Sequence, residues 1–157
     1  MFQITVGFLK ADPKARYQGY TFYFREGFCW SDINTTFLKC RKKQKSINDV
    51  KSMSLYTLTE KVPEYYIVSL INSYFMSYYV DDFVNNTQTF QINDARQLPI
   101  RIPTLEQLLL CQLLYRRAIE LKQNVSNGTI DETDIEQELF DIEQELNVFI
   151  NELYYFI

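Results

Sequence analysis

The residues best suited to chemistry in this chain are positively charged and crowd into one short stretch. Lysine or arginine occupies five of the seven positions from 39 to 45, namely Lys39, Arg41, Lys42, Lys43 and Lys45. Residues 1–52 hold 10 Lys or Arg against 4 Asp or Glu, a net charge of +6, whereas residues 104–157 hold 3 against 11, a net charge of −8. Such a basic segment can bind a polyanion even though the whole chain carries −4. The alternative is that both ends are ordinary solvated surfaces.

The residue types that most enzymes use are absent or scattered. The chain has no histidine, which excludes Ser-His-Asp triads, Cys-His dyads and nearly all zinc enzymes. Its 4 glycines stand alone, so no glycine-rich phosphate loop can be drawn through them. Cys29, Cys40 and Cys111 are too widely spaced for a CxxC metal knuckle or a disulfide framework. We therefore expect no enzyme activity from the chain by itself, no cofactor and no metal.

Length and composition fit one packed domain with an appendage. The chain has 157 residues, of which 46% are hydrophobic, enough for a sizeable core. No apolar run approaches about 18 residues, the length that a membrane span requires. The first residues also lack the basic start and apolar stretch of a signal peptide. We therefore expect a cytoplasmic protein with reduced thiols and no membrane contact.

The first 103 residues predict a small mixed β lobe with a packed helix. Four short runs rich in aromatic and β-branched residues predict strands: Tyr20–Phe24, Phe37–Arg41, Ser54–Leu58 and Thr89–Ile92. Pro63 opens a run with helical spacing that reaches about Val80. The prolines of the segment 98–103 require an extended backbone there.

Residues 104–157 predict an antiparallel helical hairpin. Thr104 and Gln107 form a capping box before a helix that runs to about Gln123, and Asn127-Gly128 marks the turn. A second helix begins near Asp131, and its apolar positions step alternately by 4 and 3 residues: Ile135, Leu139, Ile142, Leu146, Phe149 and Leu153. The predicted fold class is therefore α+β, with a lobe over 1–103 and a hairpin over 104–157.

Two sets of hairpin residues lie off the helix–helix seam. One set is acidic and is interpreted as a solvated face, because a carboxylate-bridged metal site would need inward glutamates and a histidine: Glu136, Glu138, Glu143 and Glu145. The other set makes the first helix apolar most of the way round: Leu108, Leu109, Leu110 and Leu113. Such a helix needs more than one neighbour, either the lobe or a partner.

Four stretches of the chain carry a resemblance to a known family. Phe24–Ile33 places a glycine, aromatic residues and a serine before an apolar residue, and Tyr65–Ser73 contains the letters LINS. Ile92–Gln107 includes LPIRIPTLEQ, and Val148–Tyr155 ends in NELYY. In this order they resemble the C-terminal target-recognition region of type IIG restriction–modification enzymes, TaqI-like specificity domains and PglX-like adenine-specific DNA methyltransferases.

The resemblance covers about residues 20–157 and implies a detached specificity fragment or a split subunit. The chain has no NPPY-type tetrapeptide and no glycine-rich S-adenosylmethionine loop, so it resembles only the recognition part of those enzymes. It implies a non-catalytic module that recognises double-stranded DNA for a restriction–modification or phage-defence system. The hairpin would then be a spacer and docking arm for a methyltransferase or endonuclease partner. The alternative function is a protein-interaction module, inhibitor or antitoxin-like, that uses the acidic hairpin.

The resemblance also implies a set of DNA-binding residues. They are Arg25, Lys39, Arg41, Lys42, Lys43, Lys45, Asn85 and Asn86. Arg41 is suited to a two-pronged contact with guanine or phosphate, and the lysines to phosphate. The asparagine amides are suited to adenine edges. Five phosphate contacts predict a slope of about −4 to −5 for log K against log salt.

Each of these residues also has a structural interpretation. A lysine-rich run is often an exposed loop, and Asn-Asn-Thr is commonly turn chemistry. Trp30 and the tyrosine pairs at 65–66 and 78–79 are expected in the core rather than stacked on bases.

Overall fold

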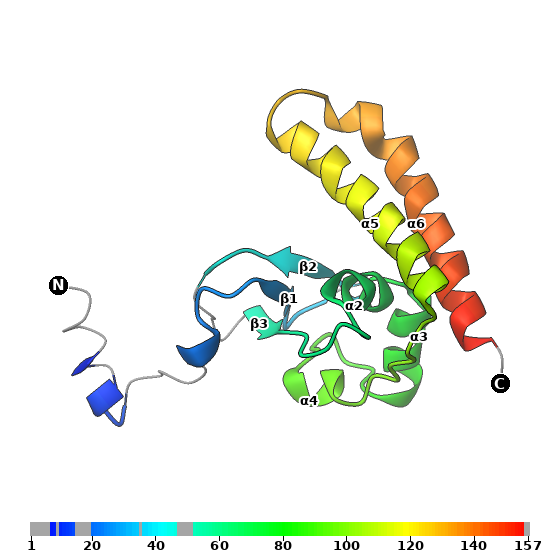
Figure 1. The fold of residues 1–157 in the computed structure, drawn as a ribbon. Helices are drawn as coiled ribbons and strands as arrows, with labels where there is room; N and C mark the ends of the chain where they lie inside the picture. Colours follow the sequence, from blue (N-terminus) through cyan, green and yellow to red (C-terminus); the bar gives the residue numbers. More distant parts are fainter. Residues whose placement is uncertain (1–6, 9, 15–19, 35, 47–51, 156–157) are drawn as a thin grey trace.

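The computed structural model describes residues 7–8, 10–14, 20–34, 36–46 and 52–155 (Figure 1). A short 3₁₀ turn and three strands come first: η1 (Tyr20–Phe22), β1 (Gly27–Ser31), β2 (Cys40–Lys43) and β3 (Ser52–Leu55). Three helices complete the lobe: α2 (Glu64–Ile71), α3 (Tyr74–Phe83) and α4 (Ile92–Ala95). Two long helices follow: α5 (Leu105–Ser126) and α6 (Glu132–Tyr154). The α+β class and the long C-terminal hairpin are confirmed.

The three strands form an antiparallel sheet in the order β2-β1-β3. Trp30 of β1 lies opposite Cys40 on one neighbour and Met53 on the other. Phe28 and Trp30 alternate with Cys29 along β1, so both aromatic side chains point to the same face of the sheet. Both belong to the core cluster that contains the α2 residues, whereas Cys29 does not, so this face is the one that packs on the helices.

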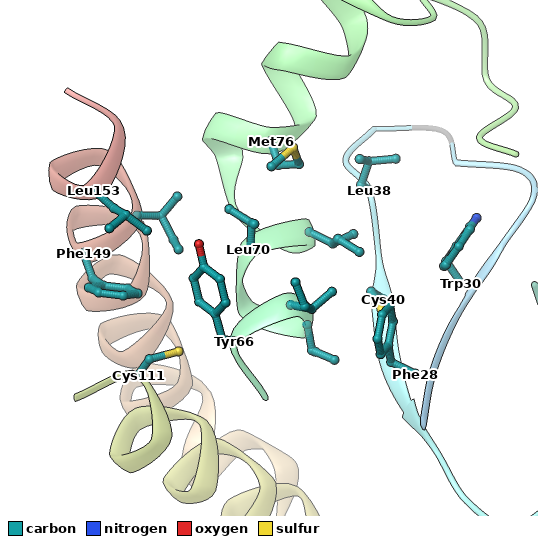
Figure 2. Packing of buried hydrophobic residues seen from close by; sticks show 14 of the residues in the cluster. Phe28, Trp30, Leu38, Cys40, Tyr66, Leu70, Met76, Cys111, Phe149 and Leu153 are labelled. Atoms are coloured by element: carbon teal, nitrogen blue, oxygen red, sulfur yellow. The ribbon is translucent and has the colours of Figure 1, made fainter. Parts of the chain in front are cut away.

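Helix α2 is the middle layer between the sheet and the hairpin. Every residue from Tyr66 to Ile71 is buried. Figure 2 shows Tyr66 between α2 and the Phe149 and Leu153 side chains of α6, with Phe28 and Trp30 on the opposite side of α2. One cluster of buried residues therefore includes Trp30 of the lobe together with Phe149 and Leu153 of the hairpin. The lobe and the base of the hairpin share one hydrophobic core.

The far half of the hairpin has a small core of its own. Leu114 and Leu121 of α5 pack with Ile135 and Ile142 of α6.

The local signals predicted for the ends of α5 are confirmed. Thr104 and Gln107 form the predicted capping box, with Gln107 N–H donating to Thr104 Oγ1 over 3.3 Å. The predicted turn is also confirmed, since Gly128 adopts a left-handed φ of 70° that favours glycine.

Two predicted strands are wrong. In the first, Tyr20–Phe24, residues Tyr20–Phe22 form the turn η1 instead, and the Phe22 ring stacks on Tyr56 with centroids 5.1 Å apart. An aromatic-rich run can bury its rings by local stacking without joining a sheet. Thr89 makes only an isolated bridge to Ile33, and the chain enters α4 at Ile92.

The predicted helix from Pro63 to about Val80 is divided into α2 and α3. Ser73 begins α3 as its N-cap, because its side chain accepts a hydrogen bond from Met76 N–H. The residue before it, Asn72, turns its side chain to the edge of strand β2. Cys40 N–H donates to Asn72 Oδ1 over 2.6 Å, and Asn72 Nδ2 donates to Cys40 O over 2.9 Å. Because the helix ends at Asn72, the side-chain amide of this residue can bond to the N–H and C=O of Cys40, as a neighbouring strand would do at that edge of the sheet.

We expect Asn72→Ala to lower the free energy of unfolding by about 1–2 kcal/mol, because both peptide groups of Cys40 lose their partner. Urea unfolding should show a lower midpoint with an unchanged m-value. Asn86→Ala, at an exposed position in another loop, is the matched control and should change stability by less than about 0.5 kcal/mol. Equal midpoints for the two variants would show that Asn72 does not hold the strand.

The proline-rich segment 98–103 is held by two buried tyrosines. Tyr66 Oη donates to Arg101 O over 2.8 Å, and Tyr154 Oη donates to Pro99 O. Arg101 Nη1 donates to Leu153 O over 2.7 Å, which satisfies a carbonyl at the end of α6. This segment therefore fixes the base of the hairpin to the lobe.

Candidate nucleic-acid interface

A concave surface lies between strand β2 and the hairpin. One hollow, of about 630 Å³, is bordered by β2 and its preceding residues, by α2 and α3, and by both hairpin helices. A second hollow, of about 390 Å³, shares Lys42, Tyr115 and Ile119 with it. Val68, Ile119 and other apolar residues supply much of the lining. The two hollows therefore form a continuous depression with an apolar interior.

Several cations border this surface. Lys39, Arg41 and Lys42 line the larger hollow from the β2 side and are exposed, and Lys122 lines it from α5. Lys42 lies 3.7 Å from Glu26, with both side chains about half exposed, so this ion pair holds the lysine only weakly. Three of the five predicted phosphate contacts in residues 39–45 thus border the hollow, although alternation along β2 turns the side chains of Arg41 and Lys42 to opposite faces of the sheet.

Lys43 lies elsewhere and is buried. Its ammonium group donates to Ser46 O over 3.0 Å and to Tyr56 Oη over 3.1 Å, and it lies 5.5 Å from the centre of the Tyr56 ring. Alternation along β2 is the reason, because it turns Lys43 to the face opposite Lys42. Lys43 is therefore a structural lysine and is removed from the predicted DNA contacts. Lys45 is exposed beyond the end of the strand.

Arg25 lies against the stacked rings of Phe22 and Tyr56, near Lys43. Its guanidinium lies 5.3 Å from the centre of the Phe22 ring and 6.0 Å from that of Tyr56. Cation–π contacts of this kind stabilise the turn before β1. Arg25 is exposed but lines neither hollow, so the structure does not bring it together with Lys39 and Arg41.

Asn85 is engaged in turn chemistry. Its Nδ2 donates to Thr89 O over 2.9 Å and to Asp94 Oδ2 over 3.2 Å, and its Oδ1 accepts from Thr87 N–H over 2.9 Å. These bonds occupy the amide atoms that an adenine edge would need. Asn86 is exposed beside it, and neither asparagine lines the concave surface.

An aromatic group at one end of the larger hollow was not predicted from the sequence. Phe37 and Tyr74 line the hollow with ring centroids 5.0 Å apart, and Tyr78 stands edge-on to Phe37 at 6.3 Å. The expected place of Tyr78 in the core is wrong, because it is 60% exposed, whereas Trp30 and Tyr66 are core residues as expected. The one sequence signal that could have indicated this group was the position of Phe37, two residues before the first lysine of the basic run, Lys39.

The hairpin wall of the hollow also carries a negative charge. Glu143 of α6 lines the hollow and raises the pKa of the Tyr74 hydroxyl. Of the predicted solvated face, Glu136, Glu143 and Glu145 are exposed, whereas Glu138 is half-buried and forms an ion pair with Arg117. Glu143 is the one of these carboxylates that borders the concave surface. A polyanion would be attracted to the β2 wall and repelled from the α6 wall.

The thiols are poor nucleophiles, although Cys40 borders the hollow. Burial raises the pKa of Cys40 to about 12 and that of Cys111 to about 11. Both therefore stay protonated at neutral pH and are not activated for covalent chemistry. Among the described residues, no group of three or more His, Cys, Asp or Glu is placed to hold a metal ion.

These thiols predict a loss of stability in alkali. An unfolded cysteine loses its proton near pH 8.5, whereas the folded thiols keep theirs to about pH 11 and 12. The folded state then binds more protons than the unfolded one, so stability falls as pH rises from about 9 to 12. Urea midpoints at pH 8 and 10 should differ less in Cys111→Ala than in the native chain. An unchanged difference would contradict a buried, neutral Cys111.

The comparisons with known proteins identify no family. No protein-family model matches the chain, and no curated protein is significantly similar to it. None of the helices in the described ranges is long and apolar enough to cross a membrane. The resemblance to target-recognition regions therefore rests on the four sequence stretches alone.

Proposed function

We propose that this chain is a DNA-recognition module of a cytoplasmic restriction–modification or phage-defence system and is not catalytic by itself. Its β2 wall would lie against the backbone of double-stranded DNA. The hairpin would hold the lobe beside a methyltransferase or endonuclease chain that supplies the chemistry. The proposal joins the sequence resemblance to one structural observation, the concave face with Lys39, Arg41 and Lys42 along its edge.

The chemistry of this face supports nucleic acid better than a small anionic ligand. The cations are exposed and belong to strand β2 and the residue before it, an open arrangement that suits phosphates of a chain more than one enclosed anion. Phe37 and Tyr74 stand at one end of the same surface with Tyr78 beside them, and they add apolar contact area there. Arg41 is the residue suited to a two-pronged contact with guanine.

A protein-binding role for the hairpin is the second candidate. The observation that favours it is the exposure of four leucines on α5: Leu105, Leu109, Leu110 and Leu113. Contiguous apolar surface of this kind is typical of protein contacts. This role is compatible with DNA binding, because the leucines lie on α5 and do not line the concave surface.

Salt dependence of binding to a random DNA duplex tests the proposal. Four available cations in residues 39–45 predict a slope of about −4, so affinity should fall about 250-fold between about 50 and 200 mM salt. The chain should be measured alone and with the product of the neighbouring gene. Absence of salt-sensitive binding in both measurements would refute a DNA-recognition role.

A further inference from the structure

The outer side of helix α5 carries a row of leucines that no described part of the chain covers. The exposed fractions are 75% for Leu105, 58% for Leu109 and 67% for Leu113, and Leu110 beside them is 45% exposed. The opposite side of α5 contributes the fully buried Cys111 to the core. The hairpin and the lobe therefore satisfy one side of this helix and leave a second apolar side without a neighbour.

Two opposite charges stand at the ends of this row, Glu106 at one end and Arg116, which also lines the smaller hollow, at the other. Glu106 precedes Leu109 by three residues, and Arg116 follows Leu113 by three residues. The spacing 106-109-113-116 is a 3-4-3 pattern, which places all four side chains on one face of the helix. Within the described part of the chain, neither Glu106 nor Arg116 forms an ion pair. We name Glu106, Leu109, Leu113 and Arg116 the outer seam.

We propose that the outer seam is the contact surface for a second copy of this chain, with the two α5 helices antiparallel. A two-fold axis that crosses the outer seam at the level of residue 111, midway between Leu109 and Leu113, places Glu106 of one copy opposite Arg116 of the other. The same axis places Leu109 of one copy opposite Leu113 of the other. A parallel arrangement would instead place Glu106 against Glu106 and Arg116 against Arg116. The order of charges therefore selects the antiparallel, self-complementary arrangement over the parallel one.

The small size of the outer seam limits the expected affinity of the dimer. From Glu106 to Arg116 the helix rises about 15 Å, which is a short contact with one charged pair at each end. Leu105 and Leu110 extend the apolar area on either side. We expect a reversible dimer with a Kd of about 1–100 μM rather than an obligate one. The dimer does not depend on DNA binding, and if both properties hold, each complex carries two basic faces for two half-sites.

Sedimentation equilibrium of the full chain without DNA tests this proposal, over about 5–200 μM protein. The native chain should shift from monomer to dimer over this range. Leu109→Glu/Leu113→Glu should remain monomeric throughout, because it places four carboxylates at the centre of the contact. Leu58→Gln is the matched control, since Leu58 is 85% exposed but lies outside the hairpin, and it should dimerise like the native chain. Circular dichroism verifies that all variants are folded.

Charge reversal distinguishes the antiparallel seam from non-specific association. Glu106→Arg should raise the Kd about tenfold, because both charged pairs of the dimer become repulsive. Adding Arg116→Glu to the same chain should restore the native Kd, since the pairs are then reversed but again opposite. A native chain that stays monomeric at about 200 μM, or a double reversal no better than the single one, would overturn the proposal. Because no DNA is present, either result leaves the proposed DNA-recognition role to its own test.

Discussion

Lys39→Gln/Arg41→Gln/Lys42→Gln should weaken binding to a random DNA duplex about a hundredfold at about 100 mM salt. Each of these cations lines the β2 wall of the concave surface and is exposed, so each is available to a phosphate. Losing three of the four available contacts removes most of the counterion release that drives binding. The measurement is fluorescence anisotropy of a labelled duplex. Stability should change little, because none of the three side chains is buried.

A control with the same change in net charge separates the local surface from the total charge. Lys14→Gln/Lys61→Gln/Arg96→Gln also removes three exposed cations, but from positions that line neither hollow. It should weaken binding by less than about fivefold. Equal losses in the two triple variants would mean that DNA responds to net charge and that the concave face has no special role.

Glu143→Gln should have the opposite effect on DNA binding. Its carboxylate borders the larger hollow on the α6 wall, where it repels phosphate. Removing that charge should strengthen binding about two- to fivefold at low salt, measured by the same anisotropy titration. Glu136→Gln, exposed on the same helix but outside the hollows, is the control. A weaker complex of Glu143→Gln would place the DNA away from this face.

Ile150→Ala should lower the free energy of unfolding by about 3–4 kcal/mol. Ile150 belongs to α6 but is fully buried in the core cluster that also contains Tyr66 and Leu70 of the lobe. Truncation leaves a cavity at the junction between lobe and hairpin, where Figure 2 shows α6 and α2 facing each other across Tyr66. Val148→Ala, two residues away and 56% exposed, should cost less than about 0.5 kcal/mol.

Two probes can report whether lobe and hairpin unfold together. Trp30 is the only tryptophan of the chain and is buried in the lobe, so its fluorescence reports the lobe. Circular dichroism at the helix band is dominated by α5 and α6, the two longest helices. In Ile150→Ala both transitions should move to lower urea by the same amount, as a shared core requires. A fluorescence transition that stays in place would mean that the hairpin is a separate unit.

The hairpin could be predicted from sequence because its signals are local. A capping box at Thr104, a turn at Gly128 and a regular apolar seam from Ile135 act within a few residues of each other. The cluster that joins Trp30 to Phe149 depends on contacts between distant segments, which apolar periodicity alone does not encode.

The lobe was predicted less well because its elements depend on tertiary partners. Phe22 lies in a turn rather than a strand because Tyr56, more than thirty residues later, offers a ring to stack on. The break at Ser73 depends on Asn72 reaching the edge of β2. The same limit applied to the site. Composition located the cationic run, but only the strand pairing shows that Lys43 turns inward while Lys42 faces the concave surface.

The difference in salt slope between the native chain and Lys39→Gln/Arg41→Gln/Lys42→Gln on the same random duplex shows most directly whether the β2 wall binds DNA. The slope should be about −4 for the native chain and about −1 for the variant, because three phosphate contacts are lost. Equal slopes in the two proteins, or no measurable binding by the native chain at low salt, would rule out DNA binding by this wall.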